Sequence, residues 1–207
     1  MMRSPILVTV AVLLLVAACS GKPEVDQAPA EDAAVAADSG WTTVATDELT
    51  EAQKEQQQRG LDAIQAMAGR LMGELTTALD EGGPDDAIQV CSMRAPEIAA
   101  AVSNEYGLML GRTSHLLRNA ANAPPEWAEQ LVRDRVADPT WLVGPDGQIA
   151  GMLPIQTRAE CGMCHGPREE IADEVAAKLD QFYPEDAATG FAEGDLRGWI
   201  WVEAPPG

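Results

Sequence analysis

Cys161-Gly162-Met163-Cys164-His165 is the motif that most constrains the fold and function of this chain. Cys-x-x-Cys-His is typical of covalent haem c attachment. Two thiols at this spacing each add across one vinyl group of the porphyrin, and the following histidine reaches the iron. The whole chain has four Cys and two His, so a chance match is rare. The alternatives are a Cys-x-x-Cys redox pair or half of a zinc site.

Strand patterns lie on both sides of this motif. Residues 141–143 and 148–155 flank a Pro-Asp-Gly turn and predict a hairpin. Apolar residues alternate with other residues over 196–202, which predicts another strand, and residues 108–110 predict a shorter one. The motif therefore interrupts a mainly antiparallel sheet.

Helical patterns dominate the first half of the chain. Apolar residues at spacings of three and four between residues 61 and 79 predict a long helix that begins near Thr46 and Asp47. Residues 51–59 look too polar to be buried. Gly82-Gly83-Pro84 ends this helix, and a second helix is expected over 84–103.

Two more helices are expected around the sheet. One follows Pro124-Pro125 and carries Trp127 and Leu131, and the other covers residues 168–182 with an Ile171, Val175 and Leu179 stripe. Helices followed by an antiparallel sheet predict an α+β fold.

The N-terminus carries an export pattern. Residues 1–18 begin with a basic residue and continue as an apolar run that is too short to span a bilayer, which predicts a signal peptide. Small residues directly before Cys19 resemble a bacterial lipoprotein signal, so we expect acylation of Cys19. The alternative is ordinary cleavage that leaves a free thiol. Ser20 slightly favours the outer membrane.

The remaining chain divides into two parts. Residues 19–45 are small, polar and acidic, which predicts a lipid anchor with a disordered tether. Residues 46–207 are long enough for one domain. The full chain has 14 basic and 33 acidic residues, a balance that excludes nucleic acid as a partner. A basic redox partner is compatible with this charge, as is acidity that serves solubility alone.

Cys91 has no obvious disulfide partner if the other three cysteines are acylated or carry haem. Its spacing from Ile88, Ala95, Ile98 and Val102 puts it on the buried face of the second helix. Met93 lies on the opposite side of that helix. From the residues alone, Cys91 is equally well an inert core residue or an axial haem ligand.

The sequence resembles the haem-c-binding, PAS-like domain family of bacterial periplasmic and sensor proteins over residues 48–202. The resemblance implies a PAS-like antiparallel sheet with a long N-terminal helix and flanking helices. It also implies one covalent haem c, with His165 and Cys91 as axial ligands. The matching elements are Cys91, Arg112-Thr113-Ser114, Leu117-Arg118-Asn119, Asn122-Ala123-Pro124, Trp127, Pro154-Ile155, Cys161 to Gly166, Tyr183-Pro184-Glu185-Asp186, and Gly194-Asp195 with Gly198. Phe191 departs from the Tyr found in many members.

Arginines suit the haem propionates. Arg112 and Arg118 lie in matched segments and are the predicted contacts, while Arg168 and Arg197 could equally be solvated. His115 is expected to be a surface or loop residue, with a role as distal ligand or propionate contact as the alternative. Met109 and Met152 are expected in the core.

These features predict an exported, lipid-anchored c-type haem protein on the periplasmic side of a bacterial membrane. We expect redox sensing or electron transfer with an unknown redox or signalling protein. We expect no enzymatic activity, because two axial ligands close the iron to substrate. One alternative is a gas-responsive sensor that passes its signal to a partner, and another is a zinc-binding structural lipoprotein.

Overall fold

The computed structural model describes residues 40–207. The predicted signal peptide, Cys19 and most of the predicted tether lie outside the described residues. Between residues 40 and 207, no helix is both long enough and apolar enough to cross a membrane.

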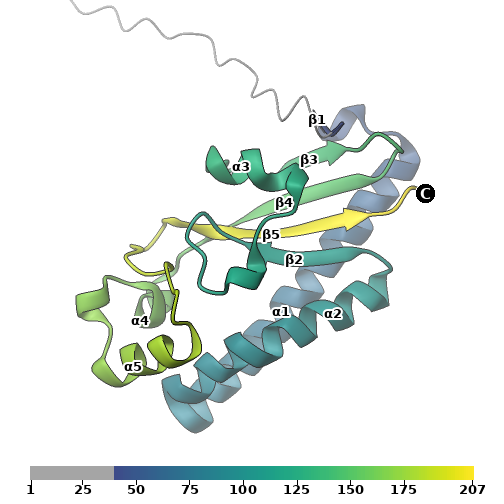
Figure 1. Ribbon diagram of the computed structural model, residues 1–207. Helices are drawn as coiled ribbons and strands as arrows, with labels where there is room; N and C mark the ends of the chain where they lie inside the picture. Colours follow the sequence, from purple (N-terminus) through teal and green to yellow (C-terminus); the bar gives the residue numbers. More distant parts are fainter. Residues whose placement is uncertain (1–39) are drawn as a thin grey trace, which may run out of the picture. The chain divides into compact units, whose positions relative to one another are not determined.

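A five-stranded antiparallel sheet forms the centre of the domain, in the order β1-β3-β4-β5-β2 (Figure 1). The predicted hairpin and the two further predicted strands are all present, which confirms the α+β, PAS-like fold class. The edge strand β1 was not expected, and it lies inside the segment 19–45 that the sequence assigned to the tether. The strands are β1 (Thr42–Val44), β2 (Met109–Thr113), β3 (Thr140–Val143), β4 (Ile149–Gln156) and β5 (Leu196–Ala204).

One face of the sheet is covered by a helical hairpin, formed by α1 (Glu51–Gln89) and α2 (Ala95–Tyr106) (Figure 1). The chain turns at Gly83, whose φ of 72° lies in the region that favours glycine. The predicted helix break at this point is therefore confirmed. An ion pair of 2.9 Å between Arg94 Nε and Glu74 Oε2 joins the two arms.

The start of α1 differs from the prediction in two ways. The helix begins after Thr50, whose hydroxyl accepts from the Gln53 amide, whereas Thr46–Glu48 forms a separate 3-10 turn. Gln56 and Gln57 are buried although their segment looked too polar for that. Their amides have partners: Gln56 donates to the Pro205 carbonyl, and Gln57 donates to Thr46 Oγ1 at 3.4 Å. Hydrogen bonds of this kind make the burial of polar groups tolerable.

Apolar residues cover both faces of the sheet. Met67 and Val102 from the hairpin pack on Ile149 and Val202 of the sheet. On the opposite face, the 3-10 turn Glu126–Ala128 and the short helix α3 (Glu129–Arg133) cover β3, β4 and β5. Trp127 and Leu131, which the sequence placed in a third helix, are buried there.

The segment 157–195 leaves the sheet after β4 and returns to it at β5. Thr157 and Asp195 close the base of this excursion, with the Thr157 amide donating to the Asp195 carbonyl at 2.8 Å. The excursion holds a 3-10 turn (Ala159–Cys161), the single-turn helix α4 (Gly162–His165) and α5 (Asp173–Phe182), which packs against α1 (Figure 1). It therefore carries the whole Cys-x-x-Cys-His motif outside the sheet.

Candidate functional site

The motif is folded as one tight helical turn. Cys161 ends the 3-10 turn, and Cys164 and His165 lie on α4. The amide of Gly166 donates to the Gly162 carbonyl at 2.9 Å. A Cβ on Gly166 would lie 2.6 Å from that carbonyl oxygen, so only glycine fits directly after the motif.

The imidazole of His165 is held by its Nδ1 atom. Nδ1 lies 2.8 Å from the Ala188 carbonyl oxygen and 3.2 Å from Arg197 Nε. The carbonyl can only accept, so the shorter contact makes Nδ1 the protonated nitrogen, and Arg197 then makes a charge contact rather than a hydrogen bond. Nε2 has no hydrogen-bond partner within residues 40–207. Burial, with the charges of Arg197 and Arg118, lowers the pKa of His165 to about 3, which keeps the imidazole neutral and able to ligate a metal.

Arg118 joins the motif to the loop that follows α5. Its Nε donates to Asp186 Oδ2 at 3.0 Å, and its Nη2 donates to the carbonyls of Cys164 and Ala188. The side chains of Arg118 and Asp186 are only 10% and 4% exposed, so this is a buried ion pair. Most N–H donors of this guanidinium are thus occupied by protein acceptors. Its contact with a propionate stays a prediction.

Arg197, which the sequence left as equally well solvated, lies beside His165 instead. It is partly buried beside His165, and its Nη1 donates to Ser114 Oγ at 3.0 Å. Its guanidinium also lies over the Phe191 ring, 5.1 Å from the centroid. The only sequence signal was the cationic residue near the start of a strand that returns from the motif. Arg168, by contrast, is exposed and pairs with Asp180.

Arg112 lies on β2, opposite Ile200 of β5. Its guanidinium makes no hydrogen bond to any residue of the described part of the chain. Its charge favours the Cys91 thiolate, against the larger effect of burial that raises the pKa of this thiol, and contributes to the lowered pKa of His165. Arg112 is therefore the better placed of the two predicted propionate contacts.

Cys91 lies in a π-helical segment, Val90–Arg94, between α1 and α2. Burial raises the pKa of its thiol, and the charges of Arg112, Arg118 and Arg197 oppose this. Burial raises the pKa of the Cys164 thiol, and the charge of Cys91 acts in the same direction. Met93 of the same segment is exposed, as expected.

An apolar wall adjoins Cys164. Cys164 packs on a buried cluster that joins α1 to α5. Burial and the nearby Cys91 raise the pKa of Tyr183 in this cluster to about 12, so the phenol is neutral. The cluster members are Ile88, Ile171, Val175, Leu179 and Tyr183.

Positive charge exceeds negative charge around these groups. Arg112, Arg118 and Arg197 act together on Cys91 and His165, and Asp186 is the one carboxylate paired with any of them in the described residues. Burial and the other two arginines lower the pKa of Arg197 to about 10. An anion bound here would relieve this repulsion.

His115 lies in the loop after β2, as expected, but it is partly buried rather than fully exposed. Its ring lies 5.8 Å from that of Phe191 and 6.1 Å from that of Trp199. Its Nδ1 atom is buried and has no partner in residues 40–207. In the same range, no three His, Cys, Asp or Glu side chains are grouped to hold a metal ion, so the ligands of the zinc alternative are not assembled.

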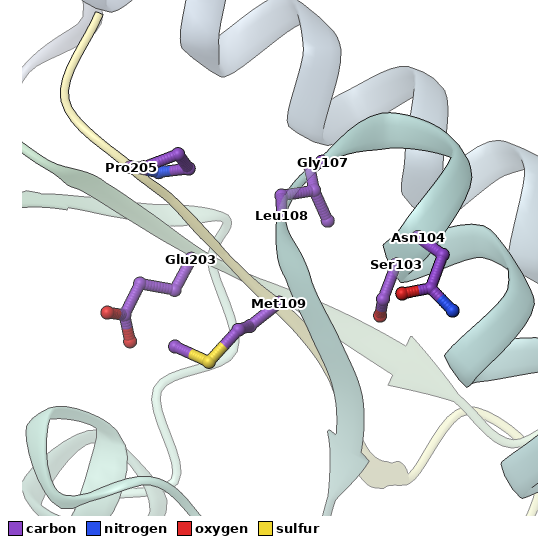
Figure 2. Close-up of a pocket in the computed structure, with 7 residues that line it drawn as sticks. All are labelled: Ser103, Asn104, Gly107, Leu108, Met109, Glu203 and Pro205. Carbon is purple, nitrogen blue, oxygen red and sulfur yellow. The ribbon is translucent and has the colours of Figure 1, made fainter.

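A shallow hollow lies elsewhere, where α2 leads into β2 and β5 ends (Figure 2). This is the opposite end of β2 from Arg112. Met109, expected in the core, lines this hollow and is 54% exposed, whereas Met152 is buried as expected. The lining residues are Ser103, Asn104, Gly107, Leu108, Met109, Glu203 and Pro205.

The fold and the site define a PAS-like α+β domain in which a Cys-x-x-Cys-His turn interrupts the sheet. The chain belongs to the Tll0287-like family, which it matches over residues 28–205. A crystal structure described as the cyanobacterial heme-protein Tll0287 has the same fold, with a TM-score of 0.54 and 22% sequence identity. The match covers 76% of this chain and 97% of that one. No curated protein matches the chain.

Proposed function

We propose that this chain binds one haem c covalently, through thioethers at Cys161 and Cys164, with His165 and Cys91 as axial ligands to the iron. The observation that carries the proposal is the meeting of these groups. Cys164 in the excursion packs on a cluster that contains Ile88, three residues before Cys91 in the helical hairpin, and His165 is neutral with Nε2 unpaired in residues 40–207. The name of the structural relative, a heme-protein, supports the same cofactor.

The residues present fit this group in three respects. The apolar wall around Cys164 suits a porphyrin face. The excess of arginine charge suits the two propionates, with Arg112 as the guanidinium that has no protein partner among the described residues. The Nδ1–H of His165 is fixed by the Ala188 carbonyl, an arrangement that orients a ligating imidazole.

The bound haem would supply a one-electron Fe(III)/Fe(II) couple. A thiolate ligand donates electron density and favours the oxidised state. Two axial ligands leave no open position, so we propose redox sensing or electron transfer rather than an enzymatic reaction. The electron or the signal would pass to a partner protein of unknown identity. Acylated Cys19 would anchor the protein on the periplasmic side of a bacterial membrane.

The first experiment is maturation of the full chain in a cytochrome c assembly host. We expect haem that stays attached through acid-acetone extraction and gives a c-type pyridine haemochrome. The Cys161→Ala/Cys164→Ala double variant should lose this covalent haem. Colourless wild-type protein would contradict the proposal.

The axial role of Cys91 needs its own comparison. Cys91→Ala should change the ferric spectrum by removing the thiolate band pattern. Met93→Ala is the matched control, because Met93 lies in the same π-helical segment but is 59% exposed. An unchanged ferric spectrum in Cys91→Ala would show that Cys91 is not a ligand.

Gas-responsive sensing is a second candidate, and the π-helical segment favours it. Such segments accommodate one extra residue in a helical turn and are frequent at functional sites. A change of this turn to regular α-helix would move Cys91 relative to His165. Binding of CO or NO by the reduced protein, with loss of the Cys91 ligand, would support sensing. A reduced spectrum unaffected by either gas would support simple electron transfer.

The proposed anchor is tested by cell fractionation. Wild-type protein should be found with the membranes, and Cys19→Ala should be released as soluble periplasmic protein. Membrane association that persists in Cys19→Ala would contradict the anchor without affecting the haem proposal.

A further inference from the structure

We propose that Arg197 is a positioning residue that holds a positive charge against the back of His165 and thereby raises the reduction potential of the bound haem. This inference rests on the proposed haem function. It opposes the effect of the Cys91 thiolate, which lowers the potential. The Cys91 thiolate and the Arg197 charge beside His165 would then shift the reduction potential in opposite directions.

The guanidinium of Arg197 is fixed in place. Nη1 donates to Ser114 Oγ at 3.0 Å and lies 3.4 Å from the Leu116 carbonyl oxygen. The Ser114 hydroxyl is itself held, because it donates to the Arg197 carbonyl at 2.7 Å and accepts from the Leu116 amide at 3.1 Å. The Phe191 ring lies under the same guanidinium and adds a cation–π contact.

The charge of Arg197 faces His165 without a neutralising partner. Nε lies 3.2 Å from His165 Nδ1, and no carboxylate forms an ion pair with Arg197 in the described part of the chain. Hydrogen bonds to a serine hydroxyl and a carbonyl hold the side chain but leave its full charge in place. The field of this cation therefore acts on the imidazole and on whatever Nε2 ligates.

The hydrogen bond on Nδ1 acts in the same direction. A carboxylate partner would draw the Nδ1 proton and make the imidazole a more basic, more electron-donating ligand. His165 instead donates to the Ala188 carbonyl, which also accepts from Arg118 Nη2 at 3.2 Å. A carbonyl shared with a cation is a weaker acceptor, so His165 stays a neutral, modest donor.

The sign of the effect follows from charge. Reduction adds one electron to the iron, and no bond or proton of Arg197 changes. The oxidised iron carries one more positive charge than the reduced iron, so a nearby fixed cation disfavours the oxidised state. Removal of the cation should lower the reduction potential.

The test is redox titration of the mature haem protein with and without this charge. Arg197→Gln should shift the ratio of oxidised to reduced protein about tenfold towards oxidised at fixed applied potential, which corresponds to about 59 mV for one electron. Arg197→Lys keeps the charge and should shift the ratio by less than half of this. Arg70→Gln is the control, because it removes an equal charge from an exposed ion pair between α1 and α2 and should leave the potential unchanged.

Ser114→Ala keeps the charge but removes the hydroxyl that holds it, so it should lower the potential by an intermediate amount. If Arg197→Gln fails to attach haem, redox titrations of Ser114→Ala and Arg197→Lys test the inference instead. An Arg197→Gln protein with attached haem, an unchanged ferric spectrum and the wild-type potential would overturn the inference. Failure of the wild-type chain to attach haem would instead refute the proposed function, so the two failures are distinct.

Discussion

The sheet and the excursion 157–195 are held together by different forces. In the sheet, the packing is mainly apolar: the Trp141 ring lies against Gly60 of α1 and Gly151 of β4. In the excursion, the helices are short, and buried charges bind backbone carbonyls. Arg118 alone connects Cys164, Asp186 and Ala188.

The difference has a physical origin. The single turn of α4 is too short to be stable alone, and its last carbonyls lack partners within the helix. Arg118 supplies one by donating to the Cys164 carbonyl. We therefore expect apolar substitutions in the sheet to change global stability, and charge substitutions in the excursion to change the position of His165 as well.

Arg118→Met should have the largest effect. It leaves the Asp186 carboxylate, 4% exposed, without its cation and removes a donor from the Cys164 and Ala188 carbonyls. Removal of one partner from a buried ion pair costs about 3–5 kcal/mol. Chemical denaturation should show this loss, and the ferric spectrum should change as the Ala188 contact to His165 loosens.

The double variant Arg118→Met/Asp186→Leu separates the ion pair from propionate binding. It should regain most of the lost stability, because no unpaired buried charge remains. If Arg118 mainly served a propionate, Asp186→Leu alone would be well tolerated and the double variant would gain nothing. That outcome would remove the contrast between the two regions.

Local sequence patterns were enough to predict most of the sheet region. The three- and four-residue spacing of α1, the glycine break at Gly83 and the Pro-Asp-Gly hairpin are all signals within a few residues, and each is confirmed. The errors there include the unexpected strand β1 and the exposure of Met109. Gln56 and Gln57 are buried because groups outside their helical turn accept hydrogen bonds from their side-chain amides. The periodicity of the helix cannot identify those acceptor groups.

The excursion was less predictable for the same reason. The motif itself was evident, but its support comes from residues far away in sequence. Arg118 precedes Asp186 by 68 residues, and Arg197 follows His165 by 32. Alternation along β5 gave no reason to single out Arg197. The π-helical turn at Cys91 also has no sequence signature that periodicity could detect.

Gly151→Ala should have a smaller effect that is confined to the sheet. A Cβ at this position would lie 2.4 Å from the Trp141 ring, and overpacking of this kind costs about 1–3 kcal/mol. The haem spectrum should stay unchanged, which denaturation and absorption measurements on one sample can establish. A changed spectrum would show that the sheet and the site are coupled.

Gly69→Ala is the matched control for Gly151→Ala. Gly69 lies within α1, and a Cβ there meets nothing within 4 Å. Alanine at such a site should stabilise the protein by about 0.5–1 kcal/mol, because glycine is the poorer helix former. Equal effects of the two substitutions would argue against steric packing as the cause.

The smallest expected effect is a pH dependence due to His115, which lies at the boundary between the two regions. Burial, with the charges of Arg135 and Arg197, lowers its pKa from 6.5. Above the unfolded-state pKa of 6.5 the histidine is neutral in both the folded and the unfolded chain. Its contribution to stability does not vary with pH there. Below this pKa the unfolded chain binds a proton that the folded chain resists, so stability falls with pH. Because the ring is partly exposed and screened by solvent, the slope should stay well under the limit of about 1.4 kcal/mol per pH unit.

His115→Phe keeps the ring contacts to Phe191 and Trp199 but cannot titrate. It also removes the buried Nδ1 atom that has no partner in residues 40–207, so it should cost little at neutral pH. The difference in unfolding free energy between wild type and variant should grow in favour of the variant as the pH falls from about 7 to about 5. Parallel curves would mean that His115 is protonated equally in both states. Its burial between the two rings would then carry no electrostatic cost, and the boundary between the regions would behave like the apolar sheet rather than the charged excursion.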